Sequence, residues 1–252
     1  MLHAITGKKS KFYRRYLGHR ESGERRVCEE DELTAMLLGP LALMPPQIMG
    51  VFWKELLLSR HVSDLPDGFP VSGEMHFWPK RSNIEPDLFV TLTWRDGEKR
   101  VLLVEMKWGS GLSEKQLHKQ WQIFLSPEEQ EKAFHLFIGK NTIEAIKAEQ
   151  EEDVWNGRLQ AFSWDAVLSV LSTMQRENRQ QHKDLQTWIE QILGVLPKLG
   201  LRPFFGFDRI TLSDACLEVS SNNTVFWTGF TGFIWMPCII IPAYESTLFF
   251  NA

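Results

Sequence analysis

Three ionisable side chains lie at the two ends of a sequence segment that strongly predicts a hairpin. Asp87 precedes an apolar run, and Glu105 and Lys107 end the next apolar run, eighteen residues after Asp87. The turn dipeptide Asp96-Gly97 between these runs is typical of a hairpin. A hairpin centred there pairs Asp87 with Met106, within one residue if a bulge is present. Because strand side chains repeat every two residues, Glu105 and Lys107 share a face, and we expect all three groups to converge at the open end.

The neighbouring sequence makes this cluster chemically informative. Leu102, Leu103 and Val104 precede Glu105 without a polar break, which is typical of a strand covered on both faces. An unpaired charge after such a run is costly. Two carboxylates suit Mg²⁺, and a lysine beside them can hold a water molecule and offset charge that develops on phosphorus. From spacing alone, the alternative is a cross-strand ion pair worth ~0.2–1 kcal/mol.

Predicted helices and further strands precede and follow the hairpin in the sequence. Leu33, Leu37 and Leu41 recur at helical spacing, and Pro45-Pro46 ends that pattern. The predicted order is helix 29–43, helix 51–58, loop 61–73, strand 74–78, hairpin 87–107, helix 113–125, strands 133–138 and 159–162, helix 164–174 and a helical stretch 175–191. We therefore expect an α/β fold. Trp108, Trp121, Trp155, Trp164 and Trp188 are expected in its core or at the core rim.

The hairpin and its flanking elements resemble the PD-(D/E)xK nuclease superfamily. The resemblance rests on Pro86-Asp87, on the interval that follows, and on Glu105-Met106-Lys107. It covers about residues 29–174 and implies a restriction-endonuclease-like αβββαβ core. It also implies that Asp87, Glu105 and the carbonyl of Met106 bind Mg²⁺ or Mn²⁺, and that Lys107 positions the attacking water. The implied reaction is hydrolysis of phosphodiester bonds.

Two further positions follow from the resemblance. Many members carry a glutamate on the first helix, and helical spacing places Glu30 on the stripe of Leu33 and Leu37. The alternative is an acid that merely favours the helix N-terminus. Many members also carry a glutamine on the helix after the lysine strand, where Gln116 and Gln120 share a face. We expect Gln116 to be catalytic and Gln120 to bind nucleic acid, against the alternative of an exposed helix. His118 is expected at the surface.

Charge is distributed unevenly along the chain. Residues 1–27 carry eight basic and two acidic side chains, a net charge of +6, whereas the whole chain has a formal net charge of −4. Such a basic arm suits contact with a polyanion, because Lys and Arg release counterions condensed on phosphates. A solvated N-terminus is the alternative. The expected nucleic-acid contacts in the arm are Lys8, Lys9, Lys11, Arg14 and Arg15.

Several function classes lack their sequence signatures. The three cysteines form no CxxC pair, which argues against a disulfide scaffold or zinc site and fits a reducing compartment. The chain contains no GxxxxGK[ST], GxSxG or HExxH motif. The N-terminus has no uninterrupted apolar run, so secretion is not indicated. The resemblance to the nuclease superfamily implies a cytoplasmic protein.

Three regions are predicted: a basic arm at 1–28, a nuclease-like domain at 29–196 and a β-rich accessory segment at 197–252. Pro237 and Pro242 interrupt the apolar run 225–250, which favours two strands over a membrane-spanning helix. Its many aromatic residues predict an interface with a protein partner.

The sequence therefore predicts a metal-dependent nuclease with DNA as partner, as in restriction or anti-phage defence. Homodimers are common where two strands are cut. The alternative is a catalytically silent nuclease-fold module that binds nucleic acid or assembles a larger complex.

Overall fold

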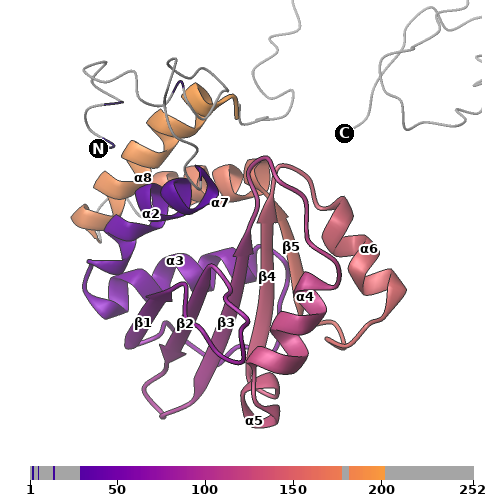
Figure 1. Cartoon of the computed structure of the whole chain (residues 1–252). Coiled ribbons are helices and arrows are strands. Elements are labelled where there is room, and N and C mark those ends of the chain that lie inside the picture. Colours follow the sequence, from indigo (N-terminus) through magenta and orange to yellow (C-terminus); the bar gives the residue numbers. More distant parts are fainter. Residues whose placement is uncertain (1, 3–4, 6–13, 15–28, 178–181, 202–252) are drawn as a thin grey trace, which may run out of the picture. The chain divides into compact units, whose positions relative to one another are not determined.

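A five-stranded mixed sheet forms the centre of the protein (Figure 1). The computed structural model describes residues 2, 5, 14, 29–177 and 182–201. The strands lie side by side in chain order: β1 (Ser72–Phe77), β2 (Leu88–Thr93), β3 (Lys99–Met106), β4 (Ala133–Gly139) and β5 (Leu159–Ser163). Strands β1, β2 and β3 are antiparallel neighbours, whereas β4 and β5 continue the sheet parallel to β3. The expected α/β class is confirmed.

The hairpin between β2 and β3 is displaced by one residue from the predicted pairing. Leu88 lies opposite Val104, and the same register places Asp87 level with Glu105 instead of Met106. The cause is a loop of three residues between Trp94 and Glu98, which still pair. Gly97, the last residue of this loop, has φ +87°. A glycine in this left-handed conformation is typical of three-residue hairpin loops with a bulge.

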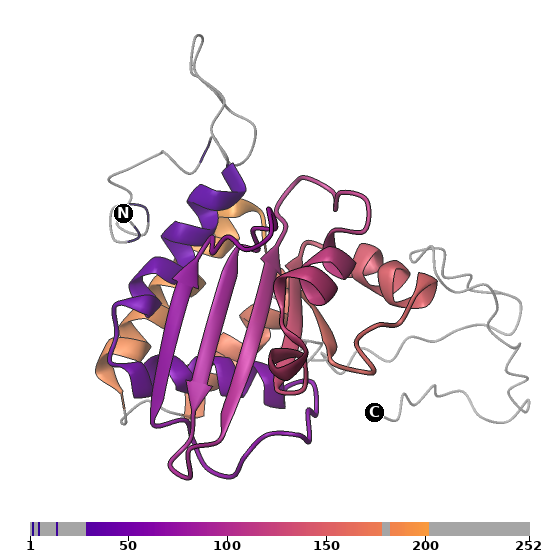
Figure 2. The same cartoon turned by 60° about the horizontal axis from the view of Figure 1, so that its bottom comes forward.

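Helices cover both faces of the sheet (Figures 1 and 2). The first face is covered by α2 (Glu29–Ala42), α3 (Pro46–Leu58), α7 (Trp164–Glu177) and α8 (Lys183–Val195), with the 3₁₀ turn η3 (Leu196–Leu199) after α8. The second face is covered by α4 (Gln116–Lys119), the π-helical turn η2 (Gln120–Phe124) and α6 (Ile143–Glu151). The short helix α5 (Pro127–Gln130) precedes β4 and has a capping box at Ser126 and Glu129.

Alternation along β3 sorts its side chains between two apolar cores. Leu102, Val104 and Met106 enter the larger core, under α2, α3, α7 and α8. Val101 and Leu103 enter the smaller core, under α4 and η2. Glu105 and Lys107 have the parity of this second set. Asp87, which directly precedes β2, has the parity of Phe89, which also lies in the smaller core. The three predicted site residues therefore share the face covered by α4 and η2.

Most predicted elements are present, with changes at their ends. The helix predicted at 113–125 is a short α-helix continued as a π-helical turn, and α6 was not predicted at all. The five tryptophans expected in the core are all buried. No helix in the described ranges combines the length and apolarity needed to cross a bilayer.

Residues from both predicted flanking regions are buried in the larger core. Leu2 and Ile5, from the predicted arm, are buried there, as are Leu199 and Leu201. The predicted contacts Lys8, Lys9, Lys11 and Arg15 lie outside the described residues, as does the accessory segment from residue 202 onward; Arg14 is described and exposed. The proposed interfaces on these segments stay predictions.

Candidate active site

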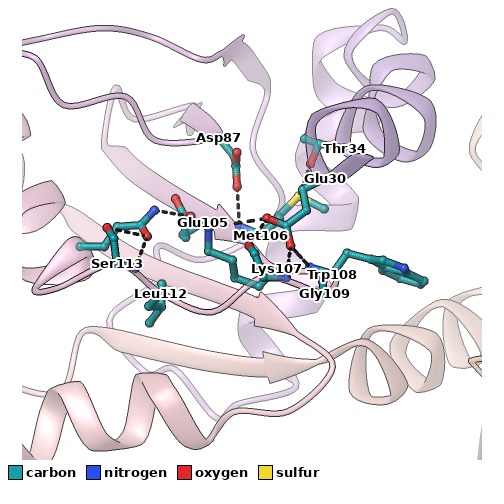
Figure 3. A network of polar contacts seen from close by, with 12 residues as sticks. Glu30, Thr34, Asp87, Glu105, Met106, Lys107, Trp108, Gly109, Leu112 and Ser113 are labelled. Atoms are coloured by element: carbon teal, nitrogen blue, oxygen red, sulfur yellow. Dashed lines mark hydrogen bonds and ion pairs between the residues drawn. The ribbon is translucent and has the colours of Figure 1, made fainter. Parts of the chain in front are cut away.

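The three predicted ionisable groups meet at the open end of the hairpin (Figure 3). Lys107 Nζ lies 2.8 Å from Glu105 Oε1. Asp87 Oδ2 accepts a hydrogen bond of 2.6 Å from the backbone N–H of Met106, so the aspartate reaches across to the strand that carries the other two groups. The convergence expected from the strand alternation is therefore present.

Glu105 is the most deeply buried member of this cluster. It is 2% exposed, and each carboxylate oxygen accepts a side-chain amide. The Nε2 group of Gln116 donates to Oε1 at 2.5 Å, and the Nε2 group of Gln120 donates to Oε2 at 2.6 Å. Together with Lys107, these donors satisfy a carboxylate that would otherwise be unpaired in an apolar environment.

Both glutamines contact Glu105, and only Gln120 departs from the predicted role. Gln116 accepts from the N–H and hydroxyl of Ser113 while it donates to Glu105, so its amide orientation is set. Gln120 is 1% exposed, and this position does not fit the predicted contact with nucleic acid. Its place is inside the cluster, because the helical spacing of four residues directs both amides at one buried carboxylate.

Burial and mutual repulsion shift the carboxylate pKa values. Desolvation, followed by the charge of Glu105, raises the pKa of Asp87 to about 8, against the opposing effects of the Met106 N–H and of Lys107. Desolvation likewise raises the pKa of Glu105, although Lys107 and both glutamines oppose it. Desolvation disfavours the Lys107 ammonium, but Glu105, Glu30 and Asp87 outweigh it and raise the lysine pKa. In the metal-free site, Lys107 is therefore a hydrogen-bond donor and a cation.

Glu30 binds the loop that follows β3. Its Oε1 accepts from the backbone N–H groups of Trp108, Gly109 and Ser110, and its Oε2 accepts from the Ser110 hydroxyl. These bonds outweigh desolvation and lower the pKa of Glu30. Oε2 also lies 3.7 Å from Lys107 Nζ. The choice of Glu30 as a residue near the site is supported, but its closest partners are backbone amides.

Helix α2 is joined to the site strand by a second contact. The Thr34 hydroxyl points to the Met106 sulfur at 3.7 Å. Thr34 follows Glu30 by one helical turn, so the same face of α2 contacts the end of β3 twice. This explains how a helix far away in sequence positions the loop beside Lys107.

The donor set is compatible with a divalent cation. Asp87 and Glu105 are two oxygen donors whose proximity raises the pKa of Asp87, and a dication between them would reverse that effect. Within the part of the chain that the structure describes, no group of three or more His, Cys, Asp or Glu side chains is arranged around a metal position. A two-carboxylate site suits Mg²⁺, which keeps several waters as ligands.

Two residues that the sequence did not indicate extend the cluster inward. His135, in β4, accepts a hydrogen bond of 3.0 Å from Trp155 and lies 3.0 Å from Gln120. The available signal was a single histidine within the apolar strand sequence AFHLFIG. The prediction that His118 lies at the surface was wrong: it is 3% exposed, and its Nε2 bonds the carbonyl of Glu152. The ring packs against Trp155, which covers it.

No protein-family model matches this chain, and no curated protein or solved structure is significantly similar to it. The class of the molecule therefore rests on its own geometry: a mixed α/β fold with a carboxylate–lysine cluster at one end of its central hairpin.

Proposed function

We propose that this protein is a metal-dependent nuclease that hydrolyses phosphodiester bonds, with DNA as its substrate. The observation that supports it most is the ion pair between Glu105 and Lys107 beside Asp87, on one face of the sheet. The element order from α2 to β4 also agrees with the αβββαβ core of the PD-(D/E)xK superfamily. We extend the proposal to a cytoplasmic role in restriction or anti-phage defence.

Asp87, Glu105 and the Met106 carbonyl would hold Mg²⁺ or Mn²⁺. The bound ion supplies a Lewis acid for the phosphate and lowers the pKa of a water molecule. In the metal-free site, Glu105, Glu30 and Asp87 raise the pKa of Lys107. As an ammonium, Lys107 would donate a hydrogen bond that orients the water toward phosphorus. As the new P–O bond forms, the attacking water would release a proton to solvent, and the leaving sugar oxygen would take one up from solvent as its bond to phosphorus breaks. The same ammonium would offset the growing negative charge.

The alternative is a silent nuclease-fold module for nucleic-acid binding or assembly. One observation favours it: both oxygens of Glu105 already accept hydrogen bonds from the protein, since Gln116 and Lys107 share Oε1 and Gln120 occupies Oε2. A carboxylate satisfied in this way is stable without a metal. The two proposals therefore differ in whether Mg²⁺ binds and whether phosphodiester bonds are cleaved.

Cleavage of supercoiled plasmid, single-stranded DNA and RNA in Mg²⁺ or Mn²⁺ tests the proposal. We expect the wild type to cut DNA and expect Asp87→Ala and Lys107→Ala to be inactive. Lys132→Ala is the matched control, because Lys132 is exposed and precedes β4, at the opposite end of the sheet. Calorimetry with Mn²⁺, repeated on Glu105→Gln, measures binding independently of cleavage. Equal activity in all variants, or no cleavage and no metal binding by wild type, would contradict the nuclease and favour the silent module.

A further inference from the structure

A chain of buried polar groups continues from Glu105 into the smaller core. It passes from Gln120 to His135 and ends at Trp155, and these three residues are 1%, 0% and 1% exposed. The connecting distances are 2.6 Å from Gln120 Nε2 to Glu105 Oε2, 3.0 Å from His135 Nε2 to Gln120 Oε1, and 3.0 Å from Trp155 Nε1 to His135 Nδ1. Polar groups are rarely placed among apolar side chains without such partners.

The chain has one direction, because its inner end, the indole of Trp155, is chemically unambiguous. An indole N–H can only donate, so His135 Nδ1 must be the unprotonated nitrogen. Burial lowers the pKa of His135 to about 3, and the imidazole is therefore neutral near neutral pH. Its single proton lies on Nε2 and is donated to Gln120 Oε1. Because the amide oxygen of Gln120 accepts from His135, its NH₂ group is the part that faces Glu105 Oε2.

Loss of the indole donor would remove this constraint. The imidazole could then carry its proton on Nδ1, and Nε2 would accept from a rotated Gln120 amide. That rotation brings the amide oxygen of Gln120 against Glu105 Oε2, which places two acceptors together in a buried site. Gln116 is held independently by Ser113, so only one side of the Glu105 carboxylate would be released.

We propose that His135 and Trp155 are positioning residues of the nuclease site, which orient Glu105 through the amide of Gln120. This inference rests on the proposed function, since the orientation matters for metal binding and cleavage. Neither residue reaches the open end of the hairpin: His135 lies opposite Leu103, two residues deeper than Glu105, and Trp155 precedes β5. Outer partners of this kind typically change metal affinity or activity about 10–100-fold.

The structure provides a matched pair of tryptophans for the test. Trp121 and Trp155 both have ring centroids 6.1 Å from the His135 ring. Trp121 stacks on it at 11°, whereas Trp155 is tilted by 50° and supplies the hydrogen bond. Both imidazole nitrogens are already engaged, so Trp121 contributes packing alone. Trp155→Phe removes the donor and some packing, and Trp121→Phe removes packing only.

The first measurement is nitrogen-15 NMR of the His135 imidazole, which reports the tautomer without any need for activity. We expect the Nε2–H form in wild type and in Trp121→Phe, and a mixture of tautomers in Trp155→Phe. The second measurement is Mn²⁺ affinity and the kinetics of DNA cleavage. In Trp155→Phe we expect at least one of Mn²⁺ affinity and kcat to fall about 10–100-fold, with KM for DNA unchanged, and Trp121→Phe to stay within about twofold of wild type.

The outcomes separate this inference from the proposed function. A tautomer change in Trp155→Phe that leaves metal affinity and kcat unchanged overturns the positioning role while the nuclease proposal stands. Equal losses in both tryptophan variants also overturn it, because packing alone then explains the effect. A wild type without metal binding or cleavage overturns the proposed function, and the NMR result then decides the hydrogen-bond direction alone. If Trp155→Phe does not fold, 3-benzothienylalanine at position 155 replaces the N–H by sulfur in the same shape.

Discussion

At the scale of single residues, the site combines one cation with several acids. Asp87, Glu105 and Glu30 surround Lys107, and Asp31 adds further negative charge near Asp87. Backbone amides donate hydrogen bonds to Glu30, and side-chain amides donate to Glu105. Among the described residues, the uncharged donor to Asp87 is the Met106 N–H alone. Asp87 is therefore the residue at which function and stability conflict most directly.

Asp87→Asn is expected to stabilise the metal-free protein and to abolish cleavage. The folded protein keeps the Asp87 proton up to about pH 8, whereas the unfolded chain releases it near pH 3.8. Stability therefore falls as pH rises between these values. In urea unfolding with a chelator, the free energy of unfolding of the variant should exceed that of wild type by ~1–3 kcal/mol at pH 8. Near pH 4 the two free energies should be equal. A difference independent of pH would contradict this account.

Glu30→Gln is expected to lower stability by ~1–3 kcal/mol, because a charged acceptor for three backbone amides, those of Trp108, Gly109 and Ser110, is lost. Thermal unfolding measures the change. Asp31→Asn is the control, since Asp31 shares the first turn of α2 but bonds none of these amides. If favourable interaction with the helix N-terminus were the role of Glu30, the two variants would lose similar stability.

At the scale of elements, the segment after β3 is the least regular part that contacts the site. Helix α4 begins after Lys115, which has φ +51° and ψ +30°, and it turns into a π-helix at Gln120. Irregular helical turns of this kind are frequent at functional sites. Here the segment brings two glutamines onto Glu105 while Trp121 and Phe124 still reach the smaller core.

Lys115→Gly is expected to stabilise the protein by ~0.5–1 kcal/mol, because glycine adopts the left-handed conformation without steric cost. The exposed contact of Lys115 with Glu152, at 3.6 Å, contributes little against this. Lys119→Gly, in the last turn of α4 with φ −61°, is expected to destabilise by ~1 kcal/mol. Chemical denaturation of both variants measures the two changes in the free energy of unfolding, which we expect to have opposite signs. Destabilisation by Lys115→Gly would show that the lysine side chain contributes more than its backbone conformation costs.

At the scale of the whole molecule, metal binding should couple to folding. Any ligand bound only by the folded state raises its stability, by ~2.7 kcal/mol at a concentration one hundred times Kd. We therefore expect the Tm to rise with Mg²⁺ or Mn²⁺ relative to chelator in wild type, and not in Glu105→Gln. A similar rise in both proteins would show that the ions act elsewhere on the surface.

The uneven charge of the chain predicts a salt-dependent contact with DNA. Each phosphate neutralised by Lys or Arg contributes a slope of about −0.9 to the dependence of log K on log salt. Replacing Lys8, Lys9, Lys11, Arg14 and Arg15 by alanine should reduce the slope by up to about 4.5 and leave the cleavage step intact. Fluorescence anisotropy across salt concentrations tests this. Point substitution is preferable to deletion, because Leu2 and Ile5 are buried in the core.

The amino-acid sequence by itself determined the chemistry of the cluster and the shared face of Glu105 and Lys107. Asp87 joins that face in the observed register, in which it lies level with Glu105. Asp87, Glu105 and Lys107 are brought together by strand alternation and a local turn, which are short-range effects and hence readable from spacing. Even there, the register moved by one residue, because the loop has three residues and not two.

Only the tertiary structure decided what surrounds those groups. The loop amides that bind Glu30 follow it by 78 to 80 residues, and His135 and Trp155 come from β4 and from the loop before β5. No local pattern links such positions, since they meet only when helices pack onto both faces of the sheet. Within the buried site that this packing creates, each polar group requires a partner, and that requirement selects the orientation of Glu105.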